Sequence, residues 1–146
     1  MIEDKNLLNY DKIHFIGAGG VSVNALAKYA ALHGKTVSAS DKTLSKDACE
    51  LKKLGVKVSL GHHAVSVRGK ELVVYTSAVA NDNPELKEAA RLGIKTANRA
   101  EYLGAITAGF KTSVAVAGCH GNTTVTALIA EIAILAGLNP SVFAGG

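Results

Sequence analysis

The sequence predicts an α/β protein: a Rossmann-like parallel sheet domain, followed by the first strand, glycine loop and helix of a second domain. Short apolar runs alternate with segments of helical spacing over about a hundred residues, which is typical of a parallel sheet with right-handed crossovers. Two glycine-rich turns, at residues 17–20 and 118–121, each follow an apolar run and precede a helical segment. These two observations carry the prediction.

Local signals set the bounds of each expected element. Strands are expected at residues 13–16, 36–39, 56–60, 72–75 and 94–96, and in the second domain at 112–116 and 141–143. Helices are expected at residues 21–32, 45–54, 84–92, 99–106 and 123–136. Asn83-Pro84-Glu85 gives one of them a cap, a proline in the first helical position and an acid in the first turn. In the helix that Ser45 caps, the expected inward-facing residues are Cys49, Leu51 and Leu54.

Composition excludes several classes of partner. The net charge is +4, but the basic residues are scattered and do not interleave with aromatics, which argues against nucleic acid. Two cysteines far apart in the sequence favour a reduced, cytoplasmic setting. The N-terminus does not read as a signal peptide, and the longest apolar segment, residues 125–136, is too short to span a bilayer. We therefore expect neither a nucleic-acid nor a membrane partner.

The first glycine turn, Gly17-Ala18-Gly19-Gly20, stands where a Rossmann fingerprint would. Glycines there let the chain turn tightly and let a diphosphate approach the backbone at the next helix N-terminus. The sixth fingerprint position holds Ser22, whose hydroxyl could bind a phosphate oxygen, and Asp41 ends the second strand, where an acid commonly meets a ribose hydroxyl. These residues alone leave open a dinucleotide, a nucleotide sugar, or a tight turn without a ligand.

The second glycine turn is half of a Walker A loop. Its lysine position holds Asn122, its first glycine position holds Val116, and Thr123 stands where a hydroxyl would bind Mg²⁺. The alternative is a glycine turn before a buried helix.

Six separated motifs together resemble one family, the Mur ligases of peptidoglycan synthesis. In chain order they are His14-Phe15-Ile16-Gly17-Ala18-Gly19-Gly20-Val21-Ser22, Val37-Ser38-Ala39-Ser40-Asp41, Gly61-His62, Val73-Val74-Tyr75-Thr76-Ser77-Ala78 with Asn83-Pro84-Glu85, Arg99-Ala100-Glu101, and residues 117–124. They fit the members that add L-alanine to UDP-N-acetylmuramate better than the members that recycle murein tripeptide.

The resemblance implies that residues 1–108 form a UDP-sugar-binding domain and that residues 109–146 begin a central ATPase domain. It implies ATP and Mg²⁺ as cofactors of the complete enzyme, with UDP-N-acetylmuramate and L-alanine as substrates, and an acyl phosphate that the amine attacks. Carried over by position, the UDP-sugar site comprises Gly17, Gly19, Gly20, Ser22, Asp41, His62, Ser77, Ala78, Arg99 and Ala100. The ATP site comprises Gly118, Cys119, His120, Gly121, Asn122, Thr123 and Thr124, with Thr123 as the Mg²⁺ ligand.

Two departures limit this expectation. Cys119 and Asn122 stand where the family has threonine and lysine. An asparagine cannot supply the positive charge that meets the β- and γ-phosphates, and losing such a contact costs about 2–5 kcal/mol. We expect the chain to bind a UDP-sugar but not to ligate alone, and we assign it no catalytic residue.

Two other functions stay open. One is a non-catalytic UDP-sugar-binding module. The other is an NAD-dependent Rossmann oxidoreductase, against which Ser22 argues because it replaces the third fingerprint glycine.

Overall fold

The structure is a computed structural model that describes residues 5–43 and 45–144. The chain divides into two compact units, with the division between Lys111 and Thr112. A five-stranded parallel sheet in the order β3-β2-β1-β4-β5 forms the centre of the first unit. Its strands are β1 (Lys12–Ile16), β2 (Thr36–Asp41), β3 (Lys57–Leu60), β4 (Leu72–Tyr75) and β5 (Lys95–Asn98). The predicted parallel α/β fold is confirmed.

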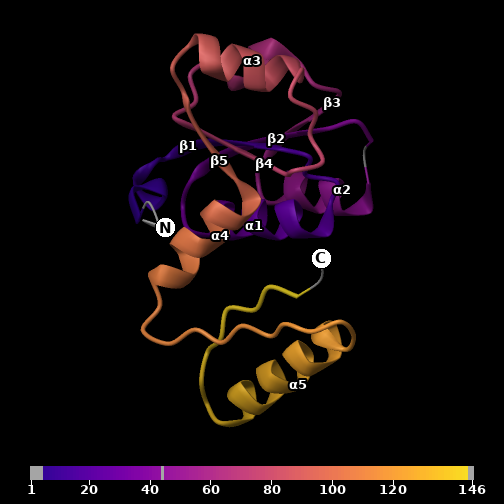
Figure 1. The fold of residues 1–146 in the computed structure, drawn as a ribbon, viewed down its shortest axis with the longest axis vertical. Helices are drawn as coiled ribbons and strands as arrows, with labels where there is room; N and C mark the ends of the chain where they lie inside the picture. The colour runs from indigo at the N-terminus through magenta and orange to yellow at the C-terminus, as the bar shows by residue number, and fades with distance from the viewer. Residues whose placement is uncertain (1–4, 44, 145–146) are drawn as a thin grey trace. The chain divides into compact units, whose positions relative to one another are not determined.

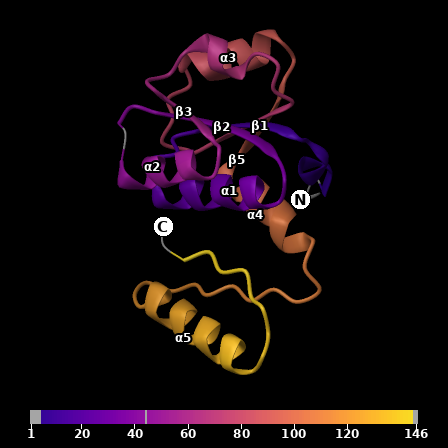
Figure 2. The same ribbon diagram turned by 180° about the vertical axis from the view of Figure 1, so that it is seen from behind.

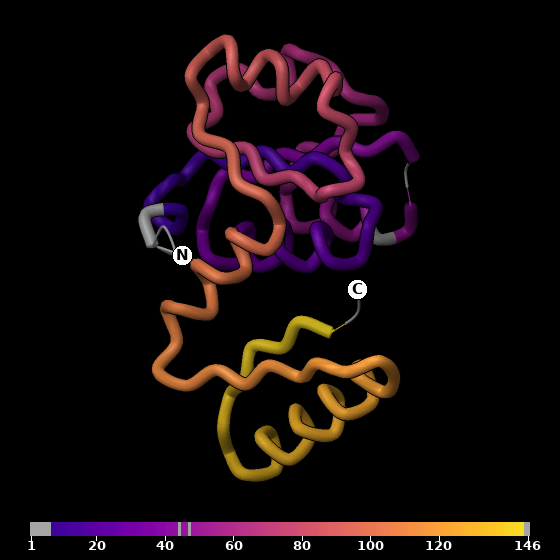
Figure 3. The backbone as a smooth tube through the Cα atoms, viewed as in Figure 1, coloured from indigo at the N-terminus to yellow at the C-terminus, as the bar shows by residue number. Residues whose placement is uncertain are grey.

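Helices cover both faces of this sheet. One face carries α1 (Val21–Leu32), α2 (Lys46–Lys53) and α4 (Arg99–Ala108), and the other carries α3 (Pro84–Arg91) (Figure 1). The view from behind shows the same layers (Figure 2). Figure 3 shows the connection from β3 to β4 running beside α3, where its 3-10 turn η2 (Ala64–Val67) contacts that helix.

A separate apolar core lies on each face. Beneath α4, the ring of Phe15 meets Tyr102 edge-on, with centroids 5.6 Å apart and planes at 80°. On the α3 face, Ile16, Val73 and the α3 residue Ala89 are fully buried together. Successive β4 residues are therefore buried on opposite faces, as its unbroken apolar sequence predicts.

The sequence did not predict two short 3-10 turns, η1 (Lys5–Asn9) and η2. The expected inner face of α2 is partly wrong. Leu51 is buried, but Cys49 is exposed and Leu54 lies beyond the last helical residue with 42% of its surface accessible. Ala48, three residues before Leu51, takes the inward position, because residues three apart share a helix face.

The second unit contains one helix, α5 (Asn122–Leu135), within the part of the chain that the structure describes. The expected strands at residues 112–116 and 141–143 do not form there, and this part of the predicted fold is wrong. No α5 residue is buried, so the buried helix of the alternative interpretation is also wrong.

Candidate nucleotide-binding site

A cavity of about 500 Å³ opens at the carboxyl edge of the sheet. Its walls come from the segments that follow β1, β2, β3 and β4. The chain winds from β1 outward to β2 and β3, then returns to the other side of β1 for β4 and β5. The cavity therefore lies at the point where the strand order reverses, which is where open α/β sheets bind ligands.

The glycine turn after β1 forms one wall of the cavity. Gly17 has φ 88°, and a Cβ there would lie 2.8 Å from the Thr76 side chain. A Cβ on Gly19 would lie 2.9 Å from the carboxylate of Asp41. The positive φ of Gly17 disfavours any other residue there, and a side chain at either position would displace the Thr76 or Asp41 side chain that it meets.

Backbone N–H groups of α1 are presented at this turn. Gly20 is the N-cap of α1 and provides no side-chain cap. The hydrogen-bond ladder starts with Asn24 N, which donates to Gly20 O at 2.9 Å. The N–H groups of the first helical turn before Asn24 have no partner inside the helix, and with the helix dipole they favour an anion.

Asp41 holds this turn in place. Its Oδ2 accepts from Gly19 N at 2.8 Å, and its Oδ1 accepts from Thr43 N at 2.9 Å. Both carboxylate oxygens already have protein donors, and the expected contact with a ribose hydroxyl stays a prediction.

The structure places the predicted UDP-sugar residues in three groups relative to this cavity. The cavity is lined by Gly17, Gly20, Asp41, His62 and Ala78. Gly19 lies within the turn itself, whereas Ser22, Ser77, Arg99 and Ala100 lie outside the lining.

Arg99 joins two helix starts that are distant in sequence. It is the first residue of α4, and its Nη1 donates to Ser22 Oγ in the first turn of α1 at 2.7 Å. A half-buried guanidinium thus lies against the helix that follows the glycine turn. Its charge adds to the positive end of α1.

Behind His62 lies a buried acid that sequence reasoning did not select. Glu85, in the first turn of α3, is fully buried. Its Oε2 accepts from Ser40 Oγ at 2.7 Å and lies 2.9 Å from His62 Nδ1, while its Oε1 lies 3.2 Å from His14 Nε2. His14 reaches Ser38 Oγ at 2.8 Å through its other ring nitrogen. The available signal was a histidine inside an otherwise apolar strand.

The network fixes the proton positions by elimination. A carboxylate only accepts, so His14 Nε2 and His62 Nδ1 both donate to it. Burial raises the pKa of Glu85, but hydrogen bonds from His14, Ser40 and His62 outweigh it and leave that pKa below the ordinary value. Nε2 of His62, a residue that lines the cavity, forms no hydrogen bond with the part of the chain that the structure describes.

The second glycine loop is closed on itself. Asn122 Nδ2 donates to Gly118 O at 2.8 Å, across the loop that precedes α5. The predicted ATP residues Cys119, His120, Gly121, Thr123 and Thr124 are exposed along it, and Gly118 lies in the same loop.

These residues do not make a complete ATP–Mg²⁺ site. The side chain at the lysine position is neutral and bonded within the loop. Across residues 5–43 and 45–144, no three His, Cys, Asp or Glu side chains group to hold a metal ion. We derive no chemical step through ATP or Mg²⁺.

No helix in the described ranges is both long enough and apolar enough to cross a membrane. The sheet order, the glycine turn and the cavity at the switch point define an open α/β protein of the Rossmann-like class.

Comparison with known proteins gives the family. The profile of the Mur ligase family, catalytic domain, matches residues 12–111, and the chain belongs to this family. The UDP-N-acetylmuramate–L-alanine ligases of Clostridium tetani and Acetivibrio thermocellus are each 43% identical, over 92% and 99% of this chain. The chain spans only 30% and 32% of their lengths.

Solved structures agree. The UDP-N-acetylmuramate-alanine ligase of Thermotoga maritima superposes with a TM-score of 0.87 at 34% identity, over 92% of this chain and 32% of that one. A murein peptide ligase from Psychrobacter arcticus gives 0.80 at 28% identity, over 86% of this chain and 26% of that one. The predicted family is confirmed.

Proposed function

We propose that the first unit binds UDP-N-acetylmuramate at the carboxyl edge of its sheet. In this proposal the chain is the N-terminal part of an ATP-dependent ligase that adds L-alanine to that sugar nucleotide in peptidoglycan synthesis. The proposal is supported by relatives named for this reaction that align with nearly the whole chain, and by the cavity at the switch point.

The single observation that carries the binding proposal is the open N-terminus of α1 beside Arg99. A nucleoside diphosphate brings two adjacent phosphates, and the glycine turn lets them approach backbone N–H groups. Arg99 adds a fixed positive charge through its bond to Ser22. Few other side chains are needed to hold a diphosphate.

His62 then serves to orient the ligand. Its Nδ1 is held by Glu85, so the ring cannot turn freely, and Nε2 is left for a ligand group in the cavity. In the neutral ring this nitrogen accepts a hydrogen bond, as from a sugar hydroxyl or an amide N–H. Such positioning, rather than covalent chemistry, is the contribution we assign to this unit.

Calorimetric titration tests the binding proposal. The 146-residue chain should bind UDP-N-acetylmuramate at one site and bind UDP more weakly. NAD is the discriminating control, because a Rossmann oxidoreductase would bind it. Saturable NAD binding without UDP-sugar binding would reverse the proposal.

The ligation proposal needs a separate test. Mur ligases are ATP-dependent and generally use Mg²⁺, whereas Asn122 provides no charge in the glycine loop. In the complete protein that contains this chain, Asn122→Lys should raise ATP-dependent addition of L-alanine at least about tenfold, because a desolvated charged contact contributes about 2–5 kcal/mol. Equal rates for the two proteins would show that this position does not limit activity.

A further inference from the structure

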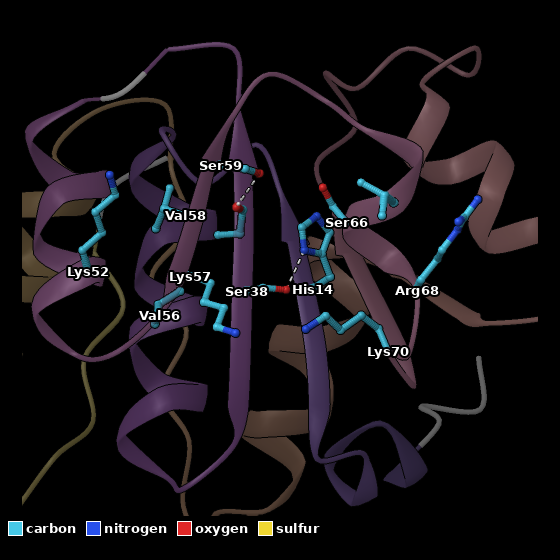
Figure 4. Close-up of a pocket in the computed structure, with 12 residues that line it drawn as sticks. His14, Ser38, Lys52, Val56, Lys57, Val58, Ser59, Ser66, Arg68 and Lys70 are labelled. Atoms are coloured by element: carbon cyan, nitrogen blue, oxygen red, sulfur yellow. Dashed lines mark hydrogen bonds between the residues drawn. The ribbon is translucent and has the colours of Figure 1, made fainter.

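A second cavity lies beside the β3 edge of the sheet, with lining residues from the β3–β4 crossover on the α3 side and Lys52 from α2. The crossover from β3 to β4 contains only the four-residue turn η2 where many α/β proteins place a helix. The register sets His14, Ser38 and Lys57 side by side on neighbouring strands of this face. Above them is a cavity of about 570 Å³, whose lining shares no residue with the nucleotide cavity (Figure 4).

The walls of this cavity carry positive charge only. Four of its lining residues are basic and none is acidic: Lys52, Lys57, Arg68 and Lys70. Figure 4 shows the ammonium groups of Lys57 and Lys70 pointing toward one another from either side of Ser38. The two positively charged ammonium groups lie beside the buried polar side chains of His14 and Ser38.

The positive charges of Lys57 and Lys70 are not neutralised by an ion pair within the described ranges. Arg68 pairs with Glu88 at 3.0 Å and turns away from the centre of the cavity, whereas Lys57 and Lys70 have no ion pair there. Burial, and then the charges of Lys57 and Lys12, lower the pKa of Lys70. Like charges held this close repel, and an anion between them would convert that repulsion into attraction.

The donors fit a tetrahedral oxyanion. Two ammonium groups approach from opposite sides of Ser38, whereas the hydroxyl of Ser66 lines the same cavity on the far side of the His14 ring from them (Figure 4). A carboxylate carries one charge, whereas a phosphate carries up to two and can present oxygens toward both ammonium groups at once. The volume also leaves room for an organic group attached to the phosphate.

We propose that this cavity binds a phosphate-type anion, either inorganic phosphate or the phosphoryl group of a phosphomonoester, held by Lys57 and Lys70. The site is separate from the nucleotide cavity and does not depend on the function proposed for it.

The test is a titration followed by backbone amide NMR at constant ionic strength, with inorganic phosphate in one arm and glucose 6-phosphate in the other. Either anion should shift the amides of Lys57 and Lys70 in a saturable manner, and the tighter of the two identifies the source. Lys57→Gln and Lys70→Gln should each weaken binding about two- to fivefold, the range for a partly exposed charge contact. Lys87→Gln, an exposed lysine outside both cavities, is the matched control and should leave the affinity unchanged.

Three results would overturn the proposal: no saturation by either anion, shifts confined to the glycine turn at residues 17–22, or wild-type affinity in the double variant. The double variant should still bind UDP-N-acetylmuramate as the wild type does. A protein that fails to bind the sugar nucleotide but binds phosphate at Lys57 and Lys70 would refute the proposed function and leave this site standing.

Discussion

Replacing Glu85 should both destabilise the fold and release His62. In Glu85→Ala, the ring of His14 and the hydroxyl of Ser40 lose a buried acceptor. Breaking a buried charged network by removing one partner costs about 3–5 kcal/mol. That is a large share of the roughly 5–15 kcal/mol that stabilises a typical domain.

Glu85→Gln removes the negative charge of the side chain and keeps nearly the same shape. The amide keeps one acceptor oxygen, but its NH₂ group must face a nitrogen or hydroxyl that donates to Glu85 in the wild type. If NH₂ replaces Oε1, His14 must move its proton to Nδ1, and if it replaces Oε2, His62 must move its proton to Nε2. We expect a cost of about 1–3 kcal/mol, the range for one unsatisfied buried polar group.

Two measurements test the effects of replacing Glu85. Urea unfolding should show a midpoint lowered by about 1 M in Glu85→Gln and by more in Glu85→Ala, given slopes of about 1–3 kcal/mol/M. Long-range ¹⁵N–¹H spectra should show the proton on His14 Nε2 and His62 Nδ1 in the wild type, and a switch of one ring in Glu85→Gln. Glu50→Gln, which removes a surface contact with Lys28, is the control and should leave both readouts near wild type. Unchanged tautomers together with an unchanged midpoint in Glu85→Gln would refute the network.

Three further changes test the cleft and the surface around it. Gly19→Ala should lower stability by about 1–3 kcal/mol in urea unfolding, because its Cβ would meet the Asp41 carboxylate at 2.9 Å. The adjacent Gly20→Ala, whose Cβ has 3.5 Å to its nearest neighbour, should leave stability closer to wild type. Arg99→Gln should weaken UDP-N-acetylmuramate binding about tenfold or more in calorimetry, with little change in unfolding, because it removes a charged hydrogen-bond donor. Hydrogen bonds from two arginines lower the pKa of Glu88 from 4.5 to about 2, so its stabilisation is present above pH 4.5 and is lost as the pH falls toward 2. Glu88→Gln should therefore lose less stability than the wild type between pH 4.5 and 2, and equal losses in urea midpoint would contradict the assignment.

Much of the first unit could be predicted because its strands and helices carry strong local signals. The apolar run at residues 72–75 coincides with β4, and Asn83 caps α3 by accepting from Glu85 N at 2.8 Å. Strand ends were less certain. The polar residues Ser40 and Asp41 belong to β2 because they pair with β3, and their backbone pairing leaves no mark in an apolar pattern.

The glycine turn could likewise be predicted, but the network behind His62 could not. His14 and Glu85 are 71 positions apart, and only the folded register brings them within 3.2 Å. Read locally, Glu85 was an acid in a first helical turn, which is a common stabilising position. Its burial follows from the packing of α3 over the sheet, which the sequence does not state.

The second glycine loop shows why a motif can identify a family without defining a working site. The helix α5 forms because its hydrogen bonds are internal, whereas the β-branched run before it is not assigned to a strand. Within the loop, the amide of Asn122 satisfies the Gly118 carbonyl at 2.8 Å. The residue in the lysine position thus stabilises its own loop and provides no charge for a phosphate. Family membership rests on the sequence and fold of the first unit. Whether the residue at position 122 limits ATP use is tested by the rate of ATP-dependent ligation of Asn122→Lys in the complete protein.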